Sequence, residues 1–243
     1  MAQFFGQRRK YSKYMLWTTS VAALLYGFLG IGSFYYLYYK FQNRLFDPLF
    51  LIPTVIIFIP IFFLIYILYK KFDIMSLQYS LGIRGERYIA KELQGLSSEY
   101  SVYIDAMVNP EKGNIDYIVI GPTGIFTIEV KSHKGVITHD GLTLLRNGSK
   151  FEKDFLKQSM AQAMSLHQYI AGKLNTEVFV NPVIVFSNFI KVNFGLNKVN
   201  NVFVIQKQWL RKLIESQRIT NFPIKRDLVE NELKALVRTV KSE

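Results

Sequence analysis

Two long apolar runs dominate the first part of the chain. Residues 15–39 and 48–69 contain no Asp, Glu, Lys or Arg. Each run is longer than the roughly 20 residues that a helix needs to cross the hydrocarbon core of a bilayer. The pattern therefore predicts two transmembrane helices, 15–39 and 48–69, that are joined by a short loop and embedded in the membrane lipid bilayer.

Basic residues flank this hairpin on both sides. Arg8, Arg9, Lys10 and Lys13 precede it, and a Lys-Lys pair at 70–71 follows it. Cytoplasmic segments next to transmembrane helices carry an excess of Lys and Arg. We therefore predict a multi-pass protein of the cell membrane with both termini in the cytoplasm.

After residue 71 the apolar positions take the spacing of a globular α/β domain. Alternation of apolar and polar residues predicts strands, and apolar residues three and four positions apart predict helices. The expected helices are 82–96, 151–174, 208–216 and 228–240, and the expected strands are 100–108, 115–121, 124–132, 142–146, 178–187 and 201–206. Residues 1–71 are thus predicted to be a basic segment with the hairpin, and residues 72–243 a separate cytoplasmic domain.

Composition narrows the chemistry that this domain can carry. The chain has no cysteine, which excludes a disulfide framework, a cysteine-ligated zinc site and a thiol nucleophile. The formal net charge is +12, and residues 70–243 hold 24 basic and 17 acidic residues, a surplus that is available to a polyanion. The segment with Lys207, Trp209, Arg211 and Lys212 is compatible with contact to a nucleic-acid backbone or to lipid headgroups, but a solvated helix face is the preferred interpretation.

Three residues stand out as candidate chemistry: Asp116, Glu129 and Lys131. If strands 115–121 and 124–131 pair symmetrically about the turn Pro122-Thr123, the numbers of opposite residues sum to 245 and Asp116 faces Glu129. Directly opposed Cβ atoms lie about 4.5–5.5 Å apart, so the two carboxylates would repel each other. A divalent cation between them is the usual solution.

The order of these residues resembles the D…(D/E)xK core of the PD-(D/E)xK nuclease superfamily. Within it, the chain is similar to the nuclease-related (NERD) family: Gly82-Ile83-Arg84-Gly85-Glu86 resembles the opening G-x-x-G-E, and Gly124-Ile125-Phe126 precedes Glu129-Val130-Lys131 as G-[IV]-F does. Gln158, in the helix, is similar to the Q motif. The resemblance covers about residues 82–210. It departs from the family at Asn114-Ile115, where a proline often precedes the Asp, and at Phe155-Leu156, which replace an Asn-Pro; the second departure leaves Gln162 as an alternative to Gln158.

The resemblance implies a restriction-endonuclease-like α/β fold, in which helices flank a mixed sheet, and hydrolysis of DNA or RNA with Mg²⁺ or Mn²⁺. Asp116 and Glu129 would hold the metal, with help from the main-chain carbonyl of Val130. Lys131 would orient water or stabilise charge on phosphorus. Glu86 would reach the metal or its water shell, and Gln158 would position water or phosphate.

Other interpretations of these residues are also open. A lone E-x-K on a strand is usually a solvated face, and Lys131 could simply form a surface ion pair with a carboxylate. The fold could also serve as a non-catalytic, membrane-tethered module that binds nucleic acid or a protein. The repelling carboxylate pair favours the nuclease, because a binding module has no need of it.

Overall fold

The computed structural model describes residues 1–6, 11–42, 48–188, 190–192, 195–217 and 226–237. They fall into two compact units. One unit is Lys10–Ile83, and the other combines Met1–Arg9 with Arg84–Glu243. The predicted boundary after residue 71 lies inside a continuous helix, and the first residues of the chain join the globular unit instead of the helical one.

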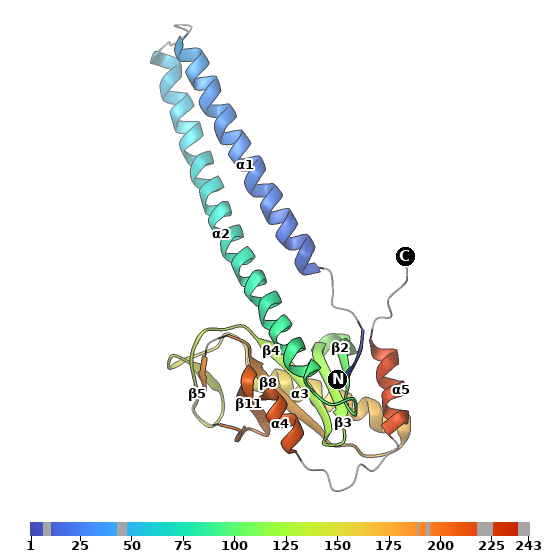
Figure 1. Cartoon of the computed structure of the whole chain (residues 1–243). Helices are drawn as coiled ribbons and strands as arrows, with labels where there is room; N and C mark the ends of the chain where they lie inside the picture. Colours follow the sequence, from blue (N-terminus) through green and yellow to red (C-terminus); the bar gives the residue numbers. More distant parts are fainter. Residues whose placement is uncertain (7–10, 43–47, 189, 193–194, 218–225, 238–243) are drawn as a thin grey trace. The chain divides into compact units, whose positions relative to one another are not determined.

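The first unit is helical (Figure 1). It contains α1 (Tyr11–Gln42) and most of α2 (Pro48–Gln94), and these two helices include the ranges 15–39 and 48–69. In the described part of the chain, however, no helix meets the length and hydropathy that crossing a bilayer requires. The two predicted transmembrane spans are therefore not supported by the structure.

The globular unit is built on a mixed sheet. Within the described residues this sheet has seven strands in the order β1-β2-β3-β4-β8-β11-β10. The strands are β1 (Gln3–Phe5), β2 (Ser101–Asn109), β3 (Gly113–Gly121), β4 (Gly124–Lys131), β8 (Val180–Phe186), β10 (Lys198–Val199) and β11 (Val202–Gln206). Strands β4, β8 and β11 are parallel to one another, whereas β2, β3 and β4 form an antiparallel meander.

A smaller sheet follows β4. Four described strands form it in the order β7-β6-β5-β9. They are β5 (Gly135–His139), β6 (Leu144–Arg146), β7 (Ser149–Lys150) and β9 (Ile190–Val192). Of these, the sequence pattern indicates only the strand at 142–146, because two to five residues are too few to establish an alternation.

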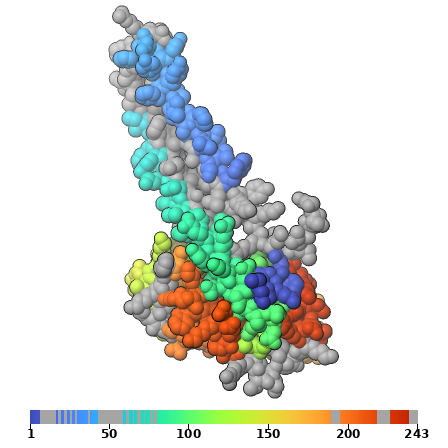
Figure 2. All heavy atoms as spheres, viewed as in Figure 1, coloured from blue at the N-terminus to red at the C-terminus, as the bar shows by residue number. Residues whose placement is uncertain are grey.

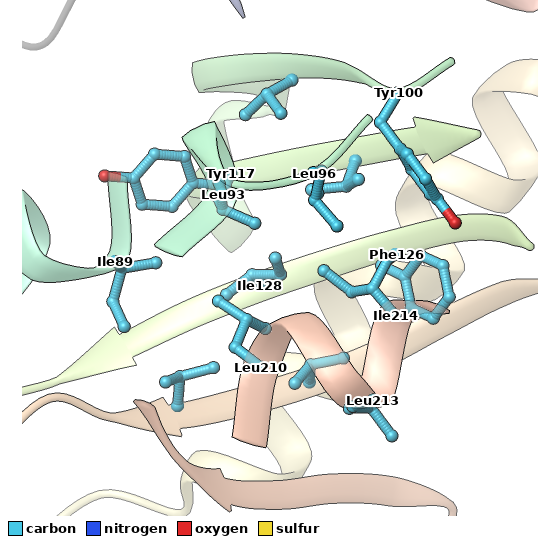
Figure 3. Packing of buried hydrophobic residues seen from close by; sticks show 14 of the residues in the cluster. Ile89, Leu93, Leu96, Tyr100, Tyr117, Phe126, Ile128, Leu210, Leu213 and Ile214 are labelled. Atoms are coloured by element: carbon cyan, nitrogen blue, oxygen red, sulfur yellow. The ribbon is translucent and has the colours of Figure 1, made fainter. Parts of the chain in front are cut away.

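Helices cover both faces of the larger sheet. On one face, Ile89 and Leu93 from the end of α2 pack with Leu210, Leu213 and Ile214 of α4 (Leu210–Ser216) against β3 and β4, as Figure 3 shows. On the other face lie α3 (Phe155–Leu174) and α5 (Arg226–Leu236). Alternate residues of β3 supply the two cores: Tyr117 and Val119 one, Ile118 and Ile120 the other. This architecture confirms the predicted mixed sheet flanked by helices.

Two short 3-10 turns connect neighbouring elements, and a side-chain cap sets the start of α3. The turns are η1 (Pro110–Lys112), between β2 and β3, and η2 (Lys207–Trp209), which leads into α4. Helix α3 begins four residues later than predicted because the Asp154 side chain accepts a hydrogen bond from the Lys157 N–H (3.0 Å) and so acts as its N-cap.

Two features of the sheet differ from expectation. Residues 3–5 form a strand that pairs in parallel with β2, although the sequence predicts only a basic segment there. Pro182 suggests an edge strand or an irregularity, but β8 is central, between β4 and β11. The proline is tolerated because it lies before Val183, where pairing with β11 begins.

Candidate active site

The β3–β4 hairpin positions the carboxylates. Its register runs from Gly121 opposite Gly124 to Tyr117 opposite Ile128, so opposite numbers sum to 245 as predicted. The ladder ends before Asp116. Beyond it, Oδ2 of Asp116 accepts a hydrogen bond from the main-chain N–H of Val130 (2.7 Å). The side chain of Asp116 thus takes over the connection between the strands where backbone pairing stops.

Glu129 is the centre of the site. It is a buried carboxylate, 7% exposed, on the face of β4 that α3 covers. Three side-chain donors reach it: Lys131 Nζ donates to Oε1 (2.6 Å), Gln158 Nε2 to Oε1 (2.9 Å) and Gln162 Nε2 to Oε2 (3.1 Å). Charge-assisted bonds of this kind offset the cost of burying a charge.

Both candidate glutamines belong to this site. The sequence leaves open whether Gln158 or Gln162 contacts the carboxylates, and the structure brings both of them to Glu129. They are four residues apart on α3 and therefore lie on one face of the helix. Gln162 also donates to the main-chain oxygen of Asn114 (3.0 Å), which ties α3 to β3 next to Asp116.

Lys131 is held from three sides. Besides Glu129, its Nζ donates to Oε1 of Gln158 (3.3 Å) and lies 4.3 Å from the centre of the Phe155 ring. The Lys131 side chain is only 14% exposed, so this is not a surface ion pair. Phe155 is a site residue that sequence reasoning missed; the signal was its place at the departure from the family pattern, one helical turn before Gln158.

The end of α2 brings Glu86 toward the carboxylates. The Tyr117 hydroxyl donates to the main-chain oxygen of Glu86 (3.0 Å), which joins the helix to β3. Gly85 makes this approach possible, because a Cβ there would lie 2.1 Å from Oγ of Ser187 and 2.6 Å from Oγ of Ser132. In the motif at 82–86, Gly85 therefore allows close packing, while Glu86 brings a carboxylate toward the site.

Burial and repulsion act on Asp116 in the same direction. Desolvation raises the pKa of its carboxyl well above the ordinary value, and the neighbouring charges of Glu129 and Glu86 raise the pKa further. The Val130 N–H and the charge of Lys131 oppose this rise. Asp116 is therefore a group that would gain from a nearby cation.

The donor set of Asp116 and Glu129 fits magnesium or manganese. Both side chains offer hard oxygen ligands, and Mg²⁺ in proteins commonly uses one or two carboxylates and keeps several waters. No group of three or more acidic or histidine side chains suited to a metal occurs among the described residues. The charge of Glu86 still acts on Asp116, and its role at the metal or its water shell stays a prediction.

One comparison with known proteins bears on the residues that form this candidate site. The chain has no match among curated proteins and none among solved structures. One family model does match, and its range runs from the end of α2 through β8, so it includes Glu86, Asp116, Glu129, Lys131 and both glutamines. Residues 81–187 match the nuclease-related domain (NERD) family, and this part of the chain is therefore similar to that family.

Proposed function

We propose that the chain is a membrane-anchored nuclease that uses Mg²⁺ or Mn²⁺ to hydrolyse phosphodiester bonds of DNA or RNA at the cytoplasmic face of the cell membrane. The observation that carries this proposal is the half-buried Asp116 beside the buried Glu129, with Lys131 Nζ 2.6 Å from Oε1 of Glu129. The family match supports a nuclease-related function. Membrane attachment is supported by the two charge-free runs of the sequence.

The side chains would divide the reaction as follows. Asp116 and Glu129 would hold the cation, and Gln158 and Gln162 would keep the Glu129 carboxylate in place. When bound, the cation supplies Lewis-acid polarisation of a phosphoryl oxygen and a more acidic water. Lys131 would turn from Glu129 toward the substrate and stabilise the negative charge that develops on phosphorus. The water oxygen would form the new P–O bond and give up a proton, while the ester P–O bond breaks and the departing oxygen takes up a proton.

A non-catalytic binding module is the second candidate, and one observation favours it. Glu129 already accepts hydrogen bonds from Lys131 and both glutamines, so its charge is compensated without any cation. A closed network of this kind stabilises a fold without performing chemistry. The nuclease requires that the Lys131–Glu129 contact opens when substrate and cation bind.

Cleavage by the full chain in detergent micelles tests the proposal. Labelled single-stranded and duplex DNA and RNA are incubated with Mg²⁺, with Mn²⁺ and with EDTA. We expect cleavage with the cations, none with EDTA, and none with Glu129→Gln or Lys131→Met. Lys131→Met should still bind the cation, measured by calorimetry, because both carboxylates remain. Absence of cleavage of every substrate, with no heat of cation binding, would leave the binding module.

A further inference from the structure

A basic stripe with an aromatic residue runs along the end of α2. Arg84, Arg87, Tyr88 and Lys91 are exposed, while Ile89 and Leu93 on the opposite side are buried in the core. Residues three, four and seven positions apart share one face of a helix. The stripe begins at the helical turn that carries Glu86, whose side chain lies on the other side of the helix.

The stripe continues onto η2 and α4. Lys207 Nζ lies 3.9 Å from the centre of the Tyr88 ring, and Lys212 Nζ lies 5.1 Å from the centre of the Trp209 ring. Tyr88 is 51% exposed and Trp209 is 42% exposed. In Figure 2 the green atoms at the end of α2 and the orange atoms of 195–217 lie together on the face shown. Two large aromatic rings thus remain open to solvent beside cations.

The sheet places this surface close to the carboxylates. Lys131, Phe186 and Gln206 are in register on the parallel strands β4, β8 and β11, so these strands end together at one edge of the sheet. Neighbouring strands are about 4.8 Å apart, which puts Gln206 about 10 Å from Lys131 across this edge. Lys207 follows immediately. Because α2 and α4 cover one face of the sheet and Glu129 lies on the α3 face, an oligonucleotide would pass around this edge to reach both the aromatic rings and the site.

A groove next to Trp209 has a different character. It is lined by Glu92, Gln208, Arg211, Lys212, Glu215 and Ser216, so it mixes cations with two carboxylates and an amide. Arg211 pairs with Glu215 (3.7 Å). Carboxylates repel phosphates but accept hydrogen bonds from the amino groups of bases. Such a groove suits exposed base edges, which a single strand offers and a duplex conceals.

Building on the proposed function, we propose that this surface binds single-stranded nucleic acid. Phosphates follow Arg84, Arg87 and Lys91, and bases stack on Tyr88 and Trp209 on their way to the carboxylate site. Exposed aromatic rings stack on any base and cationic side chains track the backbone, which is how proteins bind single strands without reading sequence. An anionic membrane surface would also attract the lysines and arginines but would not require stacking.

The test measures binding separately from cleavage. The full chain in detergent micelles is titrated, in EDTA, against a fluorescent oligothymidylate of about 20 nucleotides, which exceeds the common single-strand site size. We expect Tyr88→Ala and Trp209→Ala each to weaken binding by about 5-fold or more, and Tyr88→Phe to bind like the wild type. Arg87→Ala and Lys91→Ala should each reduce the slope of log affinity against log salt by about 0.7.

Phe179 and Lys198 provide a matched control. The Lys198 Nζ lies 5.4 Å from the centre of the Phe179 ring, and Phe179 is 66% exposed. Phe179 precedes Val180, which pairs with Ile125 at the opposite edge of the parallel strands. Phe179→Ala removes the same kind of cation–aromatic pair far from the site, so it should leave oligothymidylate binding unchanged.

Three results would overturn the proposal. The first is wild-type affinity in both Tyr88→Ala and Trp209→Ala. The second is a duplex that binds the wild type as tightly as the single strand does and whose affinity does not change in Tyr88→Ala or Trp209→Ala. The third is loss of binding to phosphatidylglycerol vesicles in these variants with oligonucleotide affinity intact, which would assign the surface to lipid. Cleavage without any effect of these variants on affinity would refute this inference alone, whereas affinity that depends on them without cleavage would refute the nuclease alone.

Discussion

The carboxyl group of Asp116 is half-buried beside a second carboxylate, and its raised pKa has a direct consequence for stability. Because the folded state holds this proton more tightly than the unfolded chain does, the stabilisation is complete below the ordinary pKa of Asp, about 3.9. It is lost as the pH rises through the raised pKa of the folded state. Metal-free protein therefore carries an ionised, unfavourable Asp116 at high pH.

We therefore expect Asp116→Asn to raise the thermal unfolding midpoint of the full chain in EDTA at pH 8, and to raise it much less at pH 5. The asparagine keeps an oxygen that can accept the Val130 N–H and removes the repulsion. Scanning calorimetry at both pH values measures the difference. Equal shifts at the two pH values would contradict a raised pKa. The same substitution should also remove stabilisation by Mg²⁺.

In contrast to Asp116→Asn, Glu129→Gln is expected to lower the stability of the metal-free protein. Repulsion from Asp116 alone would make this substitution stabilising, but the carboxylate accepts bonds from Lys131, Gln158 and Gln162. Removing one partner of a buried ion pair leaves the other charge uncompensated, which costs about 3 kcal/mol. Chemical denaturation in EDTA should therefore show a loss of stability, which the double variant Glu129→Gln with Lys131→Met largely restores.

Substitution of Gly85 tests whether close packing of α2 against Ser132 and Ser187 stabilises the domain. Substitution by alanine places a Cβ 2.1 Å from Oγ of Ser187 and 3.0 Å from its Cβ, so the Ser187 and Ser132 side chains or α2 must move. Overpacking of this kind costs about 1–3 kcal/mol. Gly82→Ala is the matched control, because its Cβ meets nothing within 4 Å. Chemical denaturation should give Gly85→Ala a lower free energy of unfolding than the wild type, and Gly82→Ala an equal or higher one. Adding Ser187→Gly to Gly85→Ala should restore part of the lost stability.

At this scale the sequence predicts residue types better than it predicts partners. The E-x-K spacing and the two-residue turn are enough to place Asp116, Glu129 and Lys131 near one another, since strand periodicity fixes which side chains share a face. The number of glutamines at Glu129 and the ring beneath Lys131 depend on how α3 crosses the sheet. That crossing is a tertiary property, which local pattern does not encode.

Among the elements, β1 has the clearest consequence. This three-residue strand pairs with β2 through Gln3, Phe4 and Phe5, and the Phe5 ring stacks on Tyr103 with centres 5.1 Å apart. Without it, β2 would present an unpaired edge, which favours association with other chains. A domain that begins at residue 72 therefore lacks a strand of its own sheet.

We expect Phe5→Ala to lower the stability of the full chain by about 1–2 kcal/mol, from lost stacking and burial. Thermal unfolding of the full chain measures this loss. The exposed Phe179, which directly precedes the central strand β8, provides the control variant Phe179→Ala. A synthetic peptide with the sequence of residues 1–6 should stabilise a chain that lacks them. No effect of either change would mean that the strand contributes nothing to the domain.

Long elements were predictable and short ones were not. The helix predicted at 151–174 and the strands predicted at 115–121 and 124–132 are long enough for the apolar positions to repeat several times, which makes their pattern distinctive. Strands β7 and β10 have two residues each, and β1 has three. Such strands exist because a neighbour offers unpaired backbone groups, so the information that specifies them lies in the neighbour rather than in their own residues.

For the whole molecule, the basic flanks at Arg8–Lys13 and at 70–71 give a topology that can be measured. Reporter fusions that are active on one side of the membrane only are placed at Glu243 and in the predicted connection 40–47, of which residues 43–47 lie outside the described residues. We expect the two reporters to signal opposite sides, with the C-terminal one cytoplasmic. Release of the full chain from membranes by alkaline carbonate would contradict the anchor itself.

The pairing of Gln3 with Ser101 has a further consequence for how the chain acquires its structure during synthesis. The first strand leaves the ribosome before either long helix, yet its partner is made only after both. Joining them closes a very long loop, which adds an entropic cost and slows the step relative to local contacts. The edge of the sheet is therefore expected to close last, after the β2–β4 meander, so a nascent chain passes through a stage in which β2 is exposed. Co-translational capture of that stage, by proteolysis of ribosome-bound chains of increasing length, should find residues 1–6 protected only once β4 has emerged as well as β2.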